Sequence, residues 1–490
     1  MDAASSLPGW ALLPSALAVT LIIVSRRRPV VREAWSIAAA VTQSAIVIAM
    51  LPAVLAGERL VWQPFAIAPS VPFLLRVDPL GALFGMLAST LWIATTVYSI
   101  GYTRALAEHA QTRYFAAFAL SLFAATGVAL AGNLLTFFVF FELLSVATYP
   151  LVIHRGTPEA ARAGRIYLAY TLGAGVMLLG AIVWTHAVAG GLDFEPGGIL
   201  PGGLAPGVVW GLFALFVLGT GVKAALVPLH TWLPIAMIAP TPVSALLHAV
   251  AVVKAGVFGL VRVIGFVFGV EVLQDVGAAA ALGAIAAATI VLGSLAALVQ
   301  DNLKRLLAFS TVSQLAYIPL GFALGTFDAM AGGVLHIASH AFLKITLFFC
   351  AGAIHATAHV DRVSDLGGMG RRMPLTMGAF AAAAFMLAGV PPGAAFVSKW
   401  HLLLGAVDAR AWWALVALLA STLLNLAYFT PIVVRAFTGP AAPVQEARPA
   451  LLVPLLATAA GGLLLGLMPE RFGRFLVLAR AVAASVVPGA

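Results

Sequence analysis

Residues 330–354 read MAGGVLHIASHAFLKITLFFCAGAI, an apolar run with two histidines and one lysine in its interior. About 20 consecutive apolar residues suffice for a helix to cross the hydrocarbon core of a bilayer, so this run predicts a membrane-spanning helix. His336, His340 and Lys344 recur every four residues and therefore lie along one face of that helix. Ionisable side chains inside a membrane span are costly and usually functional, so the run also predicts part of a functional site.

The composition of the whole chain agrees with this interpretation. Of 490 residues, 62% are hydrophobic and 9% are charged, and the mean hydropathy is +1.05. A soluble chain would carry about a quarter charged residues. The net charge of +9 comes from arginines in short loops between apolar runs, which favours membrane topology over nucleic-acid binding. Cys350 is the single cysteine, which excludes disulfides and thiolate metal clusters within the chain.

Fourteen apolar runs are long enough to cross a bilayer. They cover residues 7–24, 35–54, 80–100, 114–130, 134–153, 166–188, 208–230, 243–261, 276–299, 306–324, 330–354, 375–404, 411–434 and 451–467. Only helices and closed barrels satisfy their backbone in lipid, and these runs are too long for barrel strands. We therefore expect an all-α integral membrane protein, with a short apolar tail after Arg474 along the interface.

The loop charges predict the orientation of these helices. Loops after odd-numbered runs hold most of the arginines, beginning with residues 26–28, whereas loops after even-numbered runs hold only Arg59, Arg76, Arg262 and Arg410. The positive-inside rule then predicts a multi-pass membrane protein with both termini outside, and we expect it in the inner membrane of a bacterium. No basic residue precedes the first run, so we expect a retained first span rather than a cleaved signal peptide.

Lysine is distributed differently from arginine. The chain has 22 arginines but only 5 lysines, and four of these lysines lie inside apolar runs: Lys223, Lys254, Lys344 and Lys399. Glu142 is likewise surrounded by apolar residues. An arginine stays protonated in proteins, whereas a buried lysine can exchange its proton as a carboxylate moves toward or away from it. Lysines with a buried glutamate are therefore what a proton relay requires.

Histidines extend this pattern, because His248 precedes Lys254 in one run and histidine can pass protons through its two ring nitrogens. Structural alternatives stay open for each residue. Lys399 could extend its ammonium to the membrane interface, and Glu142 could be a structural partner of one lysine. His248 alone could equally be a hydrogen-bond partner between helices.

Two of the lysine-containing runs also contain helix breakers. Gly219 and Pro228 flank Lys223, and the segment GVPPG at residues 389–393 precedes Lys399. Proline removes a backbone hydrogen bond, and the freed carbonyls are tolerated in a membrane only inside protein or beside water. Interrupted helices in matching positions of two halves are typical of transporters built from inverted repeats, although ordinary proline kinks are the alternative.

Several segments together carry a resemblance. They are FFELLS (140–145), LHTWLP (229–234), APTPVSALLH (239–248), DNLKRLLAFS (301–310), His336-x-x-x-His340-x-x-x-Lys344 and FVSK (396–399). From about residue 78 to residue 404 the chain resembles the antiporter-like proton-channel family. This family comprises the L-, M- and N-type membrane subunits of respiratory complex I, relatives in membrane hydrogenases, and the A- and D-type subunits of Mrp cation/proton antiporters.

The resemblance implies about 14 transmembrane helices with two inverted five-helix repeats and broken helices 7 and 12. Three N-terminal helices (1–110) would precede the first repeat (111–270) and the second repeat (271–437), and a C-terminal helix and tail (438–490) would follow. Glu142 would pair with Lys223, and Lys254 would relay protons centrally. Lys399 would serve the exit half, linked to the rest by the histidines and Lys344 of run 330–354.

The resemblance also implies a subtype. The twelfth run carries lysine where the M-type usually has glutamate, and the chain lacks the long lateral helix of the L-type and the extra helices of the A-type. We expect a D-like subunit of a multi-subunit Mrp-type Na⁺/proton antiporter, with protons and Na⁺ as the ions and other membrane subunits as partners. The alternative is a proton-pumping subunit of an NADH-quinone oxidoreductase or membrane hydrogenase.

Other classes of function predict different features. A haem-binding electron carrier using His248 with His336 or His340 would show a Soret band, but it leaves the lysines unexplained. An organic-solute transporter would need a cluster of aromatic and arginine side chains, which the sequence does not show. Nucleotide, flavin and iron–sulfur motifs are absent, so we expect no cofactor and no metal in this chain, and any redox chemistry would belong to partner subunits.

Overall fold

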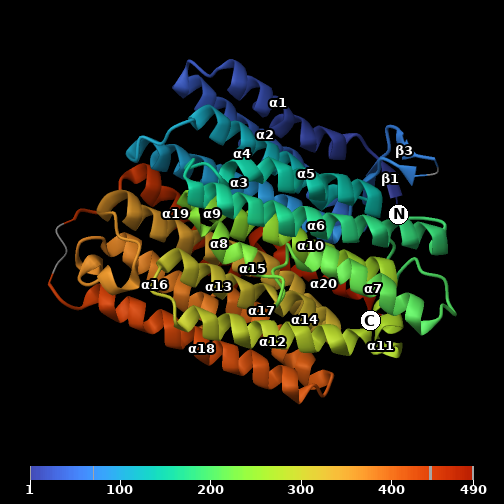
Figure 1. The fold of residues 1–490 in the computed structure, drawn as a ribbon. Coiled ribbons are helices and arrows are strands. Elements are labelled where there is room, and N and C mark those ends of the chain that lie inside the picture. The colour runs from blue at the N-terminus through green and yellow to red at the C-terminus, as the bar shows by residue number, and fades with distance from the viewer. Residues whose placement is uncertain (1, 70, 441–443, 488–490) are drawn as a thin grey trace.

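Long helices run side by side in a bundle (Figure 1). The computed structural model describes residues 2–69, 71–440 and 444–487. Within these residues, twelve helices are long and apolar enough to cross a membrane, and two further apolar helices are shorter. The prediction of an all-α integral membrane protein is therefore confirmed. Both marked ends of the chain lie at the same end of the bundle (Figure 1).

The helices of the first part of the chain are α1 (Leu7–Val24), α2 (Pro29–Leu55), α3 (Pro79–Ala105), α4 (Gln111–Leu130), α5 (Leu134–Val152), α6 (Pro158–Ala189), α7 (Pro206–Gly221), α8 (Trp232–Ile235), α9 (Thr241–Ala245), α10 (Val252–Val263) and α11 (Val270–Asp275). The later helices are α12 (Ala278–Leu298), α13 (Leu303–Leu315), α14 (Tyr317–Leu324), α15 (Phe327–Ala358), α16 (Pro374–Ala388), α17 (Ala394–Asp408), α18 (Trp412–Phe437), α19 (Pro449–Leu467) and α20 (Phe475–Val486). Two π-helical turns, Leu246–Val250 and Ile264–Phe268, flank α10, so that α9 to the second turn form one continuous span.

The two shorter helices are those in which the sequence predicts a break. Helix α7 ends at Gly221 and α8 begins only at Trp232, and α16 ends at Ala388 before α17 begins at Ala394. Gly389 follows α16 with a φ of +108°, a conformation that side chains with a Cβ rarely adopt, and so it ends that helix. The predicted broken helices 7 and 12 are confirmed, whereas the inverted-repeat boundaries stay a prediction.

Two small sheets at the end of the bundle that holds the N-terminus were not predicted (Figure 1). Strands β1 (Asp2–Ala4), β2 (Arg59–Trp62) and β5 (Leu75–Val77) form one sheet, and β3 (Ala66–Ala68) pairs with β4 (Val71–Pro72) in the other. Strand β1 is parallel to β2, and β5 is antiparallel to it. Strands this short carry too few residues for a readable alternation, and their pairing depends on segments far apart in the chain.

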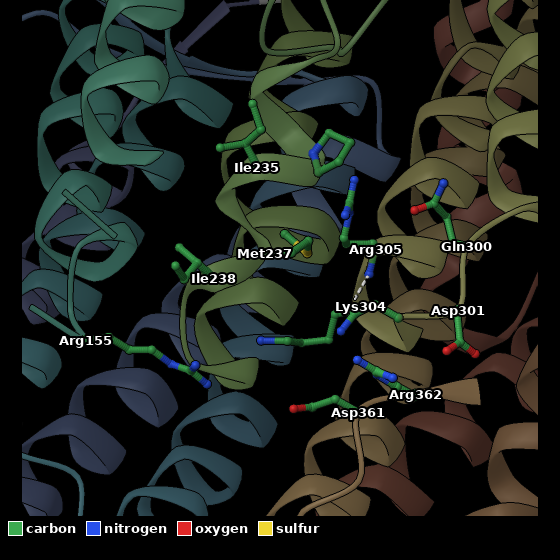
Figure 2. A pocket seen from close by; sticks show the side chains of 12 residues that line it. Arg155, Ile235, Met237, Ile238, Gln300, Asp301, Lys304, Arg305, Asp361 and Arg362 are labelled. Atoms are coloured by element: carbon green, nitrogen blue, oxygen red, sulfur yellow. Dashed lines mark hydrogen bonds between the residues drawn. The ribbon is translucent and has the colours of Figure 1, made fainter. Parts of the chain in front are cut away.

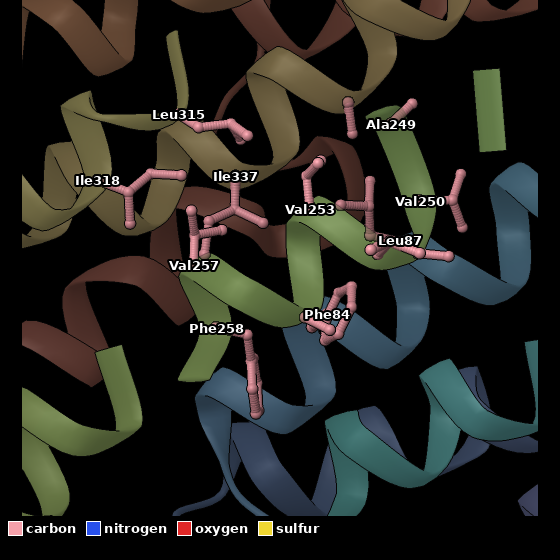
Figure 3. Packing of buried hydrophobic residues seen from close by; sticks show 14 of the residues in the cluster. Phe84, Leu87, Ala249, Val250, Val253, Val257, Phe258, Leu315, Ile318 and Ile337 are labelled. Carbon is pink, nitrogen blue, oxygen red and sulfur yellow. The ribbon is translucent and has the colours of Figure 1, made fainter. Parts of the chain in front are cut away.

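Helices α10 and α15 occupy the centre of the bundle, between α1 and α2 at one edge and α12 and α18 at the other (Figure 1). The most apolar 18 residues of the span that contains α10, and those of α15, are all buried within the chain. Figure 3 shows the apolar packing around them, in which Phe258 of α10 meets Phe84 of α3 with ring centroids 5.1 Å apart. Ionisable residues on these two helices therefore face protein and not lipid. The C-terminal tail forms α20, which packs against α15 and α3.

Candidate functional site in the bundle core

Lys223 lies at the interruption after α7, two residues beyond the last helical residue. It is fully buried, and its Nζ lies 3.3 Å from Oε1 of Glu142 in the middle of α5. The same ammonium donates to the carbonyl of Phe141 and sits 3.4 Å from the centroid of the Phe141 ring. Gly175 of α6 makes room for the carboxylate, because a methyl group at this position would lie 2.6 Å from its carbon. The structure thus brings together the predicted Glu142–Lys223 pair.

Lys254 and His340 form a second contact, between α10 and α15. Nζ of Lys254 lies 3.0 Å from Nδ1 of His340, and both side chains are fully buried. Lys254 lies in the first turn of α10, the α-helix that follows the π-helical turn containing His248. Such turns disturb the regular hydrogen bonding of a helix and are frequent at functional sites.

Helix α15 connects this contact to the second interruption. Nδ1 of His336 lies 2.9 Å from the hydroxyl of Ser398 in α17, next to Lys399. The ring centroids of His336 and His340 are 6.2 Å apart, as expected for residues one turn apart on one face. Lys344, one turn beyond His340, donates to the hydroxyl of Ser310 at 2.8 Å.

Lys399 follows the break between α16 and α17 and is buried. Its Nζ donates to the carbonyl of Ala388, the last residue of α16, at 2.9 Å and lies 5.1 Å from the centroid of the Tyr317 ring. Among the described residues, no carboxylate oxygen lies within ion-pair distance of this ammonium. The side chain points into the protein, which contradicts the alternative that it extends to the membrane interface.

His248 is the predicted residue with the fewest contacts. It is fully buried with its ring 4.8 Å from that of Phe348, and among the described residues neither ring nitrogen has a hydrogen-bond partner. The structure therefore gives no support to the alternative that His248 is a hydrogen-bond partner between helices. Nε2 of His336 and Nε2 of His340 are buried and likewise have no hydrogen-bond partner within the described part of the chain. Buried polar atoms are nearly always satisfied, so these nitrogens mark positions where water or a mobile proton fits.

Several polar residues around Lys344 were not singled out in the sequence. Tyr428 of α18 donates to Ser310 at 2.9 Å, and Asn425 contacts both Tyr428 and Ser421. All of them are buried. Neutral polar residues are common in membrane helices, so their positions in the sequence carried no signal beyond the nearby lysine.

The sequence places Arg262 in a loop, and the structure shows that this assignment is wrong. It lies in α10 with 1% of its surface exposed and donates through both terminal nitrogens to the carboxylate of Asp78 at the start of α3, with 2.8 Å between Nη2 and Oδ1. Burial by itself would raise the pKa of Asp78, but the ion pair with Arg262 and the amide of Gly81 outweigh it and lower that pKa. A paired charge can stay inside the bundle, and hydropathy does not reveal a partner so far away in the chain.

A cavity of about 710 Å³ opens at the arginine-rich end of the bundle (Figure 2). Lys304 lies between two of the predicted apolar runs and was therefore expected in a loop. In the structure it is buried in the first turn of α13 and donates to the carbonyl of Ala239 at 2.9 Å. Ala239 lies two residues before the start of the span that carries His248 and Lys254. The cavity therefore lies over the end of that span.

Four cationic and two acidic side chains line this cavity, and the other lining residues are neutral. Figure 2 shows Arg155, Lys304, Arg305 and Arg362 around it, with Asp361 beside them. Oδ1 of Asp361 lies 2.9 Å from Nδ1 of His355, and this contact lowers the pKa of the Asp361 carboxyl. The cavity walls thus keep their excess of positive charge.

The arrangement suits proton exchange along α10, α15 and α17. Its groups are lysines, histidines, one glutamate and hydroxyls, and none of them is a redox group. Among the described residues, the one group of His, Cys, Asp or Glu side chains close enough to share a metal ion lies elsewhere, at Glu108, His109 and His154.

Comparisons with known proteins identify related chains. Residues 131–425 match the family described as NADH:quinone oxidoreductase/Mrp antiporter, transmembrane. The chain is 36% identical over 416 residues to NADH-quinone oxidoreductase subunit N of Desulforudis audaxviator (strain MP104C), which covers 81% of this chain and 82% of that one.

Two further relatives widen the comparison. The Hydrogenase-4 component B of Escherichia coli (strain K12) is 32% identical over 67% of this chain, which spans only 50% of that longer protein. The structure of the Mrp complex from Dietzia sp. DQ12-45-1b contains a similar chain with a TM-score of 0.88 at 24% identity, covering 99% of this chain and 97% of the other. At that identity the structural match speaks for the fold alone.

Proposed function

Because this chain belongs to the family of membrane subunits shared by NADH:quinone oxidoreductases and Mrp antiporters, we propose that it is a proton-translocating subunit of a multi-subunit membrane complex. Its relatives are parts of such complexes by name. The observation that carries the proposal is the row of buried ionisable side chains between the two interrupted helices, from Lys223 to Lys399.

The proposed path follows the contacts in the bundle core. Protons reach the span of His248 and Lys254 from the cavity beside Lys304. From Lys254 they pass to His340 at 3.0 Å, and His336 continues along α15 to Ser398 at 2.9 Å. Mobile water completes the segments between these contacts, where side chains do not touch.

Lys223 and Glu142 form the switch in this proposal. At 3.3 Å the carboxylate stabilises the charged ammonium, and movement of Glu142 away from Lys223 releases the proton. A guanidinium at the same position would keep its proton in both arrangements. Lys344 and its hydroxyl partners form a side branch of the same path.

The subtype, the ions and the orientation belong to the proposal as well. The Mrp-type D-like assignment gains support from the likeness to the Mrp complex, and the complex I-type alternative from the long match to an N-type chain. In either complex the arginine-rich end with the cavity faces the cytoplasm of a bacterial cell, and both termini lie outside. In an Mrp-type complex the exchanged cation is Na⁺.

The test is proton transport in vesicles that contain the chain with its copurifying subunits, followed with a pH-sensitive dye. We expect Lys223→Ala to abolish transport without changing assembly, and Arg480→Gln, in an exposed ion pair with Glu470, to leave transport intact. Transport retained by Lys223→Ala would contradict the relay.

The copurifying subunits distinguish the two complexes. Hydrophilic iron–sulfur and flavin or nickel subunits would identify a redox-driven pump. Small membrane subunits together with a second, larger homologue would identify an antiporter driven by ion gradients.

A further inference from the structure

Two histidines and one glutamate from separate segments meet at the arginine-rich end of the bundle. Glu108 and His109 lie in the connection between α3 and α4, and His154 follows the end of α5. Each offers one ligand atom, and these three atoms all lie within 4.8 Å of one another. The proton path of the bundle core uses none of them.

His154 is the residue whose surroundings need an explanation. Its side chain is 1% exposed, and among the described residues neither ring nitrogen has a hydrogen-bond partner. The ring is held between His109, at a centroid distance of 4.8 Å, and Tyr114, at 5.3 Å. Its carbonyl accepts from Arg113 at 3.3 Å, which fixes the backbone there. A buried imidazole held this firmly with free nitrogens is unusual, because buried polar atoms are nearly always satisfied.

The distance between His154 and Glu108 points to what is missing. Nε2 of His154 lies 3.7 Å from Oε2 of Glu108, which is too long for a hydrogen bond. Two ligand atoms bound tetrahedrally to one Zn²⁺ are roughly 3.3–3.6 Å apart, given bonds of about 2.0–2.2 Å. The pair is therefore spaced for an ion between its members more closely than for a direct contact.

We propose that Glu108, His109 and His154 form a binding site for Zn²⁺ or a transition-metal dication of similar chemistry. Two imidazoles and one carboxylate are a donor set that Zn²⁺ accepts, and the fourth tetrahedral position stays open to water. His109 is exposed and Glu108 is partly exposed, so an ion can reach the site from solvent. His154 is the buried ligand.

Two guanidinium groups lie near this site and do not occupy it. Arg113 is engaged with the carbonyl of His154, and Arg155 lines the separate cavity of Figure 2. The bound ion ties the α3–α4 connection to the end of α5, the helix that carries Glu142. The metal site itself does not depend on the proposed proton path.

The experiment uses the full chain with its copurifying subunits, purified through a tag without histidine and stripped of metals with a chelator. Co²⁺ is titrated as a spectroscopic probe, and Zn²⁺ is then added to displace it. We expect one equivalent of Co²⁺ per chain with the visible absorption of a tetrahedral site, and displacement by Zn²⁺. His109→Ala and Glu108→Gln each weaken Co²⁺ binding at least about tenfold.

Control variants separate this site from other histidines and from the relay. His359→Ala changes an exposed histidine at another helix end and leaves Co²⁺ binding unchanged, and Lys223→Ala binds Co²⁺ normally even though it loses transport. Because His154 is buried, its replacement can disturb folding. The test therefore depends on the variant of the exposed residue, His109→Ala. Wild-type protein without stoichiometric Co²⁺ binding, or His109→Ala with wild-type affinity, would overturn the proposal.

Discussion

Each of the two interrupted helices has a buried lysine near its break, but the groups next to the two lysines differ. Lys223 and Lys399 each lie at or after a break, are buried, and donate to a backbone carbonyl beside an aromatic ring. At the first break the carboxylate of Glu142 stands 3.3 Å from the ammonium. At the second, the described residues supply only neutral dipoles.

This difference teaches how one architecture can hold two distinct proton sites. A carboxylate carries a full charge on a side chain that can move, whereas the carbonyl of Ala388 is part of the backbone and stays in place. The first break can therefore switch between two states, and the second can only hold or pass on a proton. His336 joins the second break through Ser398, so the histidine stripe ends at the passive site.

The largest effect on transport is expected from removing the carboxylate charge of Glu142, which is present at the first break and absent at the second. Glu142→Gln keeps the shape of the side chain and removes its charge, so Lys223 loses its switchable partner. We expect proton transport in vesicles to fall by about 100-fold, in the range for loss of a positioned acid–base group. Unchanged transport in this variant would mean that the two breaks are equivalent.

A smaller effect is expected from moving the carboxylate without removing it. Gly175→Ala puts a methyl group 2.6 Å from the carboxyl carbon of Glu142, so the carboxylate must shift from its present position beside Lys223. We expect transport to fall by about tenfold, since a displacement near 1 Å can cost this much. Gly173→Ala on the same helix is the matched control, because a methyl there meets nothing within 4 Å. Equal transport in the two variants would contradict a role for the position of Glu142.

The second break is tested by Ser398→Ala, which removes the hydroxyl that contacts His336 next to Lys399 in the sequence. We expect a loss of about fivefold, equivalent to about one hydrogen bond, because water can replace a hydroxyl at a passive site. The same vesicle assay measures it, with Ser398→Thr as the variant that keeps the hydroxyl. A loss as large as that of Glu142→Gln would show that the second break also switches.

The smallest effect on transport is expected at Asp78, which joins α3 to α10 and lies in neither break. Its pKa is lowered in the folded protein, so the stability it contributes is present above its unfolded pKa of about 3.9 and is lost as the pH falls through the lower folded pKa. We expect Asp78→Asn to transport normally at neutral pH and to lose about 2 kcal/mol of unfolding free energy there. Denaturation in detergent as a function of pH measures this, and the variant should lack the acid-dependent loss that the wild type shows. A transport defect in a fully folded Asp78→Asn protein would place this ion pair in the proton path.

Much of the fold could be predicted because a membrane helix can be recognised from a run of consecutive apolar residues. Fourteen apolar runs correspond to twelve long helices and two interrupted ones, and the interruptions fall at the Gly and Pro residues next to Lys223 and Lys399. Two charged residues were placed wrongly, and there is a physical reason for both errors. Arg262 and Lys304 were assigned to loops because hydropathy counts a charge as exposed, and each is buried through a contact with a distant segment.

By itself the sequence determined the all-helical membrane class, the positions of both breaks and the presence of Glu142 and four of the lysines inside the bundle, because apolar length, helix breakers and charge are properties of neighbouring residues. Only the tertiary structure decided which of these residues meet. The spacing of Glu142 and Lys223 could not show their contact, which entered only as an expectation from a family resemblance. Ser398 beside His336 and the gathering of Glu108, His109 and His154 had no signal at all. Such contacts depend on how separate helices pack side by side, and a linear chain does not contain that arrangement until it has folded.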